Sequence, residues 1–312
     1  MLGRRNLRVK VMQALYAWET DRDTNDAQLE ALLKNQIQRS VSLYLTDLLY
    51  LVETCRYSMV DKAKRMAKYI KTEEDEKAST TIAANRIIKY LEDNVQFNTL
   101  LKKEGIRNYL NEDDVKGLFN ELASKPKYKE YAALTEPTLE QDKEIIHFIL
   151  KKVMPSYTSL EQHLEELFIN YEDDNGLILY IFSKYVDGFD ESKSNFFQSL
   201  EQWEEEKKFA FDLLDKTIEH NKELSELIEP NLKNWEMDRV AILDLILMKM
   251  AVCELKYFPT IPVKVSINEY IDISKSYSTP KSKDFVNGVL DKIKNQMQGR
   301  GEIKKFGRGL ME

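Results

Sequence analysis

The chain has 312 residues, of which 43% are hydrophobic and 32% charged, and its formal net charge is −7. This length allows about two domains. The negative charge excludes a protein that binds nucleic acid by bulk charge, so an anionic partner would need a local basic patch. No apolar run is long enough to span a bilayer, and no apolar signal segment follows the basic N-terminus, so we expect a cytoplasmic protein that does not enter the membrane.

Apolar residues recur at helical spacing from residue 9 and predict a first amphipathic helix. Four basic residues crowd its start: Arg4, Arg5, Arg8 and Lys10. Positive charge is unfavourable beside the positive pole of the helix macrodipole. The cluster therefore indicates a functional surface, or else a frayed basic terminus that keeps the chain soluble.

Helical stripes of apolar residues continue from residue 20 to residue 194, and alternating strand patterns are missing. Charged stretches such as 72–77 predict solvated connections. Asn175-Gly176 lies between two helical stripes, and we expect an interhelical turn there. The predicted fold class is all-α.

Residues 240–252 are apolar on nearly every side of a helix, which is typical of a buried core helix. Ser266 and Glu269 fit a capping box and predict that the next helix begins there. Gly288, inside the last predicted helix, costs about 1 kcal/mol against alanine and suggests a close helix–helix approach.

Catalytic and metal-binding motifs are missing from the sequence. The chain has no phosphate-binding glycine loop, and its three histidines have no Cys or His at metal-ligand spacing. Cys55 and Cys253 lie in apolar helical patterns and predict buried free thiols. We expect a protein that is not an enzyme and that needs no cofactor and no metal.

A second basic segment contains Lys275, Lys281 and Lys283, with Tyr277 and Phe285 beside them. Single-stranded RNA recognition uses positive charge for phosphates and aromatic groups for bases. If the first and last helices are neighbours, both basic segments form one surface.

Two stretches resemble the NusB family of transcription antitermination factors. RRNLRVKVMQALYAWE resembles the family's opening helix, with its Arg-rich start and its Gln-Ala-Leu-Tyr string. The stretch from FDLLDKTIEH to ISKSY and the string KDFVNGVLDKI resemble its later and closing helices. The resemblance covers residues 4–19 and about 209–293, in the family's order.

The resemblance implies an all-α, NusB-like helical bundle that binds the boxA element of ribosomal-operon RNA. Its partners would be NusE, a small-subunit ribosomal protein, and the RNA polymerase antitermination complex, and its effect would be read-through of terminators. The implied RNA-binding residues are Arg4, Arg5, Arg8, Lys10, Gln13, Tyr16, Lys281, Lys283 and Phe285. The implied partner-binding residues are Glu254 and Tyr257.

The family's short connection after the first helix is replaced here by about half of the chain. We therefore expect a first helix at 1–19, a helical insertion domain at 20–194, the remainder of the RNA-binding core at 195–298 and a flexible tail at 299–312. The resemblance leaves open what the insertion does and whether the chain forms a homodimer.

Two alternatives compete with the antitermination reading. The chain could be a protein-interaction scaffold whose insertion is the working part. It also resembles the RNA-binding module that precedes the catalytic domain of ribosomal RNA cytosine methyltransferases, although no catalytic Cys motif follows here.

Overall fold

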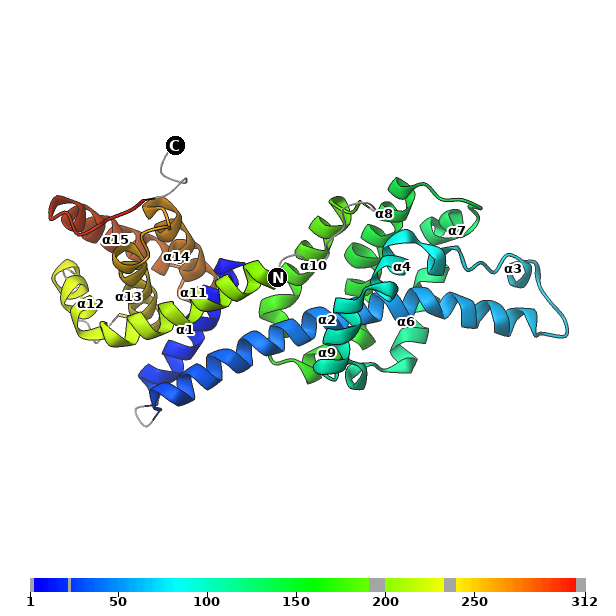
Figure 1. Cartoon of the computed structure of the whole chain (residues 1–312), viewed down its shortest axis with the longest axis horizontal. Helices are drawn as coiled ribbons and strands as arrows, with labels where there is room; N and C mark the ends of the chain where they lie inside the picture. Colours follow the sequence, from blue (N-terminus) through cyan, green and yellow to red (C-terminus); the bar gives the residue numbers. More distant parts are fainter. Residues whose placement is uncertain (1–2, 22–23, 191–199, 233–239, 307–312) are drawn as a thin grey trace. The chain divides into compact units, whose positions relative to one another are not determined.

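The computed structural model describes residues 3–21, 24–190, 200–232 and 240–306. Within these ranges every regular element is a helix and no strand occurs (Figure 1), so the predicted all-α class is confirmed. The chain divides into two compact units. The middle unit is Gln38–Glu201, and the terminal unit combines Leu2–Ile37 with Gln202–Glu312.

Over its described residues, the middle unit contains nine α-helices, of which α2 also extends into the terminal unit through residues 26–37. They are α2 (Asp26–Met66), α3 (Glu73–Glu76), α4 (Arg86–Asp93), α5 (Val95–Lys103), α6 (Glu112–Ser124), α7 (Pro126–Ala132), α8 (Leu139–Phe148), α9 (Thr158–Leu167) and α10 (Tyr171–Asp187). Short 3-10 and π turns link several of them. Fully buried residues such as Leu118 and Ile146 form the core of this unit.

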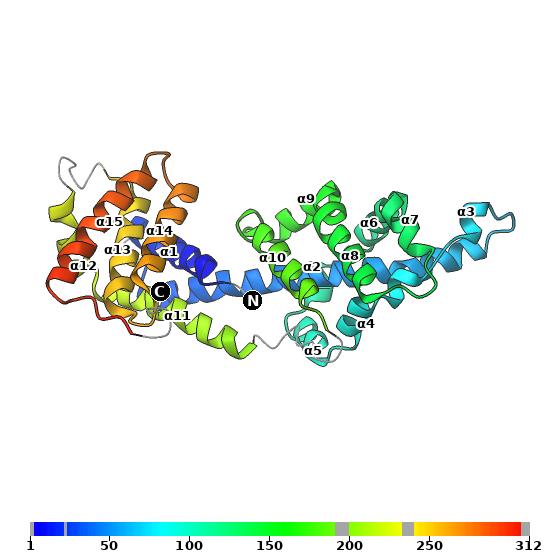
Figure 2. The ribbon, with the colours of Figure 1, turned by 90° about the horizontal axis from the view of Figure 1, so that it is seen from above.

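Two local predictions in the middle unit are wrong. Asn175-Gly176 lies inside α10, where the Asn175 amide donates to the Tyr171 hydroxyl at 2.8 Å. The stretch 72–77 holds the short helix α3, which lies beyond the C-terminal end of α2 (Figures 1 and 2). Thr72 and Asp75 form a capping box there, and the hydrogen bond from Lys68 lowers the pKa of Asp75 to about 2. Both corrections replace a predicted loop by a helix.

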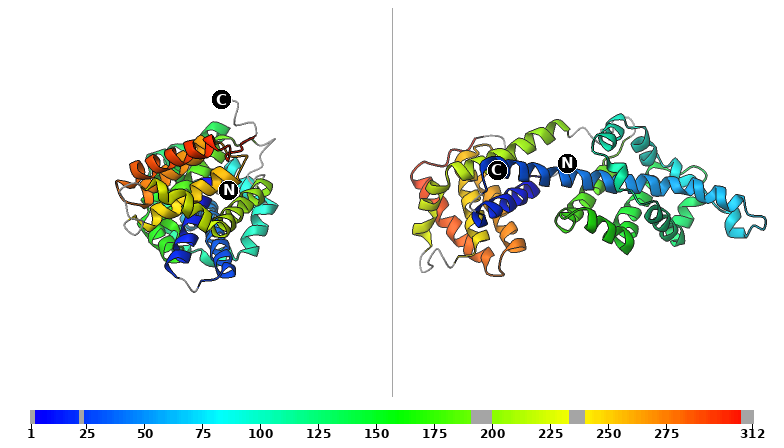
Figure 3. Two further views of the ribbon diagram at one scale, coloured as in Figure 1. Left: turned by 90° about the vertical axis from the view of Figure 1, so that its left-hand side faces the viewer. Right: turned by 90° about the horizontal axis from the view of Figure 1, so that it is seen from below.

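Over its described residues, the terminal unit contains six α-helices besides the start of α2. They are α1 (Arg4–Thr20), α11 (Leu200–Glu219), α12 (Asn221–Ile228), α13 (Ile242–Tyr257), α14 (Val263–Tyr277) and α15 (Ser282–Gly299). Helix α13 packs against α1, α12, α14 and α15 (Figure 3), and its predicted role as a buried core helix is confirmed. Its polar interruptions are paired, because Asp244 accepts from Ser282 at 2.7 Å and Lys249 binds Glu19 at 2.7 Å.

The predicted capping box at Ser266 is wrong. Helix α14 begins three residues earlier, at Val263, after Pro262 as N-cap, so Ser266 lies within the helix and is fully buried. The predicted close helix–helix approach at Gly288 is wrong as well, because a Cβ there would meet nothing within 4 Å. The glycine that does permit a close approach is Gly117 in α6, where a Cβ would lie 1.8 Å from the Tyr157 hydroxyl.

The segment after α15 contacts the end of α13. Gly301 adopts a left-handed conformation (φ +67°). The Lys305 ammonium then donates to the carbonyls of Glu254 and Phe258, at 2.9 Å each, in addition to the backbone N–H groups of Phe258 and Ile261 that these carbonyls accept. Burial lowers the pKa of Lys305 to about 8. The predicted flexible tail thus includes specific contacts up to Phe306, while residues 307–312 lie outside the described residues.

Both cysteines are buried and free, as predicted. Over the described ranges, no helix is long and apolar enough to cross a membrane.

Candidate nucleic-acid interface

The arginines at the start of α1 connect this helix to its neighbours. Arg4 Nε donates to Glu206 on α11 at 2.9 Å. Arg5 donates to both Glu269 and Asp272 on α14, at 2.7 to 3.1 Å. Both arginine side chains stay about half exposed, 41% and 51%. The basic cluster is therefore offset by carboxylates from two other helices, which explains how it is tolerated at the positive end of a helix.

Arg8 forms a buried pair with Glu254 of α13. Arg8 Nε and Nη2 donate to the two carboxylate oxygens at 2.9 and 2.7 Å, and the side chains are 2% and 0% exposed. Ser266 and Tyr270, both on α14, donate their hydroxyls to the same carboxylate at 2.6 and 2.9 Å. The Phe209 and Tyr270 rings lie 5.2 and 5.7 Å from the guanidinium carbon. Each carboxylate oxygen thus accepts two hydrogen bonds, which is what a buried charge needs.

The electrostatic balance favours a charged Arg8. Burial lowers the pKa of the guanidinium, but the hydrogen bonds and negative charge of Glu254 more than reverse this, so its pKa lies above the ordinary value. The predicted roles of Arg8 in RNA binding and of Glu254 in partner binding need accessible side chains. In the structure both side chains are buried and contact each other, so neither is exposed for such a contact.

The other predicted residues of α1 differ in exposure. Lys10 is buried, with 1% exposed, and Gln13 is half-buried. Burial places Lys10 away from the predicted RNA surface. Tyr16 is 43% exposed and presents an aromatic ring to solvent. On this helix the accessible candidates are therefore Arg4, Arg5 and Tyr16.

The second predicted basic segment lies at the start of α15. Lys281 is the N-cap of this helix, and Lys281 and Lys283 are exposed, while Phe285 is half-buried. Ser282, between the lysines, is buried and fixes the segment by donating to Asp244. The two lysines are thus held in place by backbone and serine contacts while their own side chains face solvent.

The two basic segments contact opposite ends of α13. The start of α1 is fixed at Glu254 and the start of α15 at Asp244. Ten residues of helix separate these contact points by about 15 Å, at 1.5 Å per residue. A single strand of RNA that touches both segments must therefore bridge this distance across the surface of the unit, rather than bind one compact patch.

Tyr257, the second predicted partner-binding residue, belongs to a polar cluster at the end of α13. Its ring stacks on His220, with centroids 4.2 Å apart and planes inclined by 10°. Its hydroxyl donates to Glu223 at 2.7 Å, and Lys256 binds the same carboxylate. The hydrogen bond from Lys256 lowers the pKa of Glu223, with Tyr257 adding to this. The cluster is half-buried, and Tyr257 remains an accessible candidate for a partner.

Sequence reasoning missed the acceptors of the basic cluster. Glu269 and Asp272 are three residues apart on α14, and Ser266 and Tyr270 are four apart, so each pair shares one helix face. That spacing could have indicated two polar stripes on one helix. Nothing in the spacing pointed to α1, more than 240 residues away.

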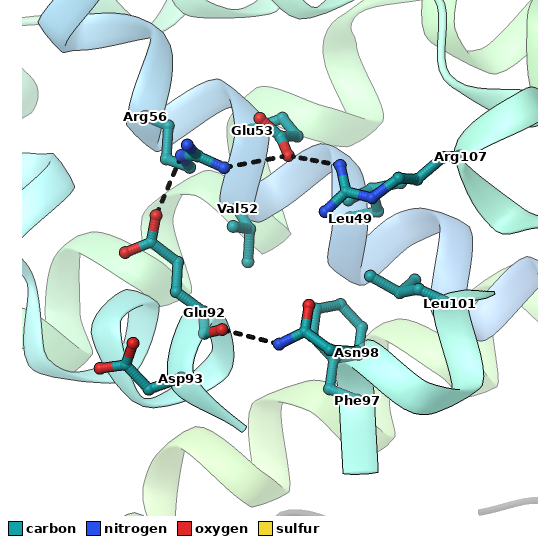
Figure 4. A pocket seen from close by; sticks show the side chains of 10 residues that line it. All are labelled: Leu49, Val52, Glu53, Arg56, Glu92, Asp93, Phe97, Asn98, Leu101 and Arg107. Atoms are coloured by element: carbon teal, nitrogen blue, oxygen red, sulfur yellow. Dashed lines mark hydrogen bonds and ion pairs between the residues drawn. The ribbon is translucent and has the colours of Figure 1, made fainter. Parts of the chain in front are cut away.

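The middle unit has a pocket of about 280 Å³ between α2, α4 and α5 (Figure 4). Its two arginines are engaged by neighbouring acids, Arg56 by Glu53 and Glu92, and Arg107 by Glu53. This pocket therefore offers no free positive charge to an anion. Among the described residues, no group of three or more His, Cys, Asp or Glu side chains is arranged to hold a metal ion.

Comparison with known proteins matches the terminal unit in particular. The NusB family model matches residues 179–295. "Transcription antitermination protein NusB" of Chloroherpeton thalassium is 51% identical over 79 residues, which are 25% of this chain and 37% of that protein. The protein of the same name from Salinibacter ruber is 49% identical over 78 residues, or 25% and 49%. That of Listeria monocytogenes serotype 4b is 52% identical over 64 residues, or 20% and 50%.

The matched part of the chain spans between about a third and a half of the length of these relatives. No solved structure matches the chain. The terminal unit is an all-α bundle built around one buried helix. Residues 179–295 are a NusB family domain, as the resemblance predicted, and an additional helical region precedes it.

The structure adds α1 to this domain. The family match begins at residue 179, yet α1 packs on α13 and carries the buried partner of Glu254. The first helix and the matched region therefore form one compact unit, although most of the middle unit lies between them in the sequence.

Proposed function

We propose that the chain is a transcription antitermination factor that binds boxA-type single-stranded RNA of ribosomal operons. In this proposal it acts with NusE, within the RNA polymerase antitermination complex, and promotes read-through of terminators. The observation that carries the proposal is the identity of about half of the aligned residues with three NusB antitermination proteins. The family match supports assigning this activity to the terminal unit.

The RNA contacts are proposed to come from the exposed members of the two basic segments. Lys281 and Lys283 present charge to phosphates, and Tyr16 presents a ring on which a base can stack. Arg4 and Arg5 contribute less, because a phosphate there must displace carboxylates that already bind them. The buried Arg8 and Lys10 support binding only by holding α1 in place. Phe285 and Gln13 are secondary candidates, since both are half-buried.

NusE is proposed to bind at the Tyr257 end of α13. The His220–Tyr257 stack offers a flat aromatic surface beside Lys256 and Glu223, which suits a mixed polar and aromatic interface. Glu254 acts there only indirectly, by fixing the end of α13 through Arg8.

The test measures binding of the full chain to boxA RNA with and without NusE, over a range of salt concentrations. The slope of log K against log salt should fall by about 0.7 for each lost phosphate contact. We therefore expect a loss of about 1.4 for the double variant Lys281→Ala/Lys283→Ala, and a smaller loss for Arg4→Ala/Arg5→Ala.

Lys292→Ala is the matched control, because Lys292 is an exposed lysine farther along the same helix. An unchanged slope for the Lys281/Lys283 variant would refute the assignment of these residues. Equal affinity for boxA and for unrelated RNA, with NusE present, would refute the proposed function itself.

A further inference from the structure

Two carboxylates of α14 occupy the hydrogen-bonding edges of the Arg5 guanidinium. Glu269 accepts from Nε and Nη2 at 2.8 and 3.1 Å, so it binds the edge on which an arginine holds a phosphate with two parallel hydrogen bonds. Asp272 accepts from Nη2 at 2.7 Å and thereby takes one donor of the neighbouring edge. No complete two-donor edge of Arg5 is therefore left for an RNA phosphate.

Arg4, the other exposed arginine of α1, is occupied in a similar way. Its Nε donates to Glu206 of α11 at 2.9 Å, and its guanidinium carbon lies 5.2 Å from the centre of the Phe209 ring. At this end of α1 the three bound carboxylates thus outnumber the two exposed arginines by one. The arginine-rich start of the sequence therefore does not present free positive charge in the fold.

The ion pairs of Arg5 lie at the surface, where their partners can exchange. The side chains of Arg5 and Asp272 are about half exposed, and an exposed ion pair contributes little to stability. The buried Arg8–Glu254 pair already connects α1 to the core helix α13, so the acids of α14 are not needed to hold α1 in place. What these acids do change is the electrostatic field that an approaching phosphate meets.

The occupied arginines affect two kinds of RNA differently. RNA without the preferred sequence is held by phosphate contacts alone, so it binds wherever positive charge is free. In the proposed function, boxA RNA is held mainly by Lys281, Lys283 and Tyr16, and neither lysine pairs with an acid among the described residues. Carboxylates that occupy Arg4 and Arg5 therefore remove a place where any RNA would bind, while they leave the lysines accessible.

We propose that Glu269 and Asp272 are specificity-determining residues, which occupy Arg5 and so prevent the start of α1 from capturing RNA that lacks boxA. The inference rests on the proposed function, because that function assigns boxA RNA to the lysines of α15. A repulsive element of this kind raises specificity by weakening the wrong complex, rather than by strengthening the right one. The two acids touch no RNA themselves and act through the arginine that they bind.

The test measures binding of the full chain, with NusE present, to two single-stranded RNAs of equal length, one with boxA and one without. Glu269→Gln/Asp272→Asn keeps the size of both side chains and removes their charge. Affinity for RNA without boxA should rise about tenfold at low salt, and its salt slope should steepen by about 0.7 for the phosphate contact that Arg5 gains. Affinity for boxA RNA should rise less than about threefold, because the lysines are unchanged.

A single variant covers the case in which the double variant does not fold. Glu269 also lies 3.8 Å from Arg8 Nη1, whereas the Asp272 carboxylate pairs with Arg5 alone among the described residues. Asp272→Asn therefore leaves the surroundings of the buried pair intact. It should raise the affinity for RNA without boxA about threefold.

Two controls separate the occupation of Arg5 from a change in net charge. Glu165→Gln/Glu166→Gln removes the same charge at two exposed acids of α9, which form no ion pair among the described residues, and should leave both affinities unchanged. In an Arg5→Ala background, the substitutions of the α14 acids should not affect RNA without boxA, because the arginine that they uncover is missing.

Four results would overturn the inference. They are an unchanged affinity for RNA without boxA, an equal rise for both RNAs, a rise that the α9 control reproduces, and a rise that persists without Arg5. A wild type that binds both RNAs equally would instead refute the proposed function. The response of RNA without boxA to the variants would still decide whether the two acids keep Arg5 from RNA.

Discussion

The buried Arg8–Glu254 pair makes a quantitative prediction about the stability of the terminal unit. Arg8→Leu leaves the Glu254 carboxylate in the interior with only the Ser266 and Tyr270 hydroxyls as donors. Removing one partner of a buried ion pair costs about 3–5 kcal/mol, because the remaining charge stays desolvated. Glu254→Leu should cost somewhat less, since Glu269 still lies 3.8 Å from Arg8 Nη1 and keeps part of its charge paired.

Urea unfolding followed by tryptophan fluorescence measures this loss. The sequence has no tryptophan between residues 38 and 201, the range of the middle unit, so tryptophan emission follows the terminal unit, where Trp18 lies on α1. With an m value of about 2 kcal/mol per M, a loss of 3–5 kcal/mol lowers the urea midpoint by about 1.5–2.5 M.

The double variant Arg8→Leu/Glu254→Leu distinguishes a coupled pair from two independent residues. Its loss should be several kcal/mol smaller than the sum of the single losses, although the two orphaned hydroxyls still cost about 1–3 kcal/mol each. Arg5→Ala is the matched control, because this half-exposed arginine also binds carboxylates and should change stability by only about 0–1 kcal/mol. Additive losses, or single losses as small as that of Arg5→Ala, would refute the reasoning.

Three further predictions concern single residues. Burial raises the pKa of Asp47 to about 8, so this group favours the folded state less as pH rises from 4 towards 8. Asp47→Asn should therefore raise the free energy of unfolding at pH 8.5 by up to about 5 kcal/mol and have little effect near pH 4. Urea unfolding followed by circular dichroism at the two pH values measures this difference. Gly117→Ala should destabilise the chain by about 1–3 kcal/mol, because the added Cβ meets the Tyr157 ring. Gly288→Ala, in open space on a helix, should instead stabilise the chain by about 1 kcal/mol. Thermal melts that show changes of the same sign for both variants would contradict this. The pKa of Lys305 is lowered to about 8, against 10.5 for the unfolded chain, so the unfolded state binds more protons between these two pH values. The wild type should therefore gain stability relative to Lys305→Met as pH rises from 8 to 10. A difference in unfolding free energy that does not change with pH would count against the contact with α13.

The all-α class and the central helix could be predicted because they depend on local patterns. The stretch 240–252 is apolar around its whole circumference, and only a buried helix accommodates such a sequence. The same holds for the helical stripes of the middle unit, whose periodicity is visible within about fifteen residues. Where one end of a helix depends on a neighbour in space, as with Ser266 and its bond to Glu254, the local capping pattern predicted the wrong start.

The two helical glycines also show that local sequence does not reveal contacts with distant parts of the chain. Gly117 and Gly288 both lie inside helices, and their sequence surroundings do not separate them. What separates them is Tyr157, which reaches Gly117 from a different part of the chain. Close approach is a property of the partner as much as of the glycine, so one chain segment cannot reveal it.

The candidate site was predictable by residue type but not by exposure. Charged residues are rarely buried unless they are paired, so Arg8 and Glu254 were both expected at the surface. Their pairing joins positions 246 residues apart, and no pattern along the chain indicates it. The exposed Lys281 and Lys283 were found correctly as a basic segment, although their RNA-binding role stays a prediction.

The pairing of the arginines affects the salt dependence that the proposed RNA binding should show. A phosphate that approaches Arg5 also approaches Glu269 and Asp272, and these two charges repel it unless the arginine turns away from them. Added salt weakens the exposed Arg5 contacts but leaves the buried Arg8–Glu254 pair almost unscreened, so α1 stays attached while its surface arginines become easier to displace. Because the lysines at the start of α15 bind no acid in the described structure, they release more counterions per contact than the arginines do. The steepest part of the salt dependence should therefore belong to the α15 end of the proposed RNA path, even though the arginines are the more conspicuous motif in the sequence.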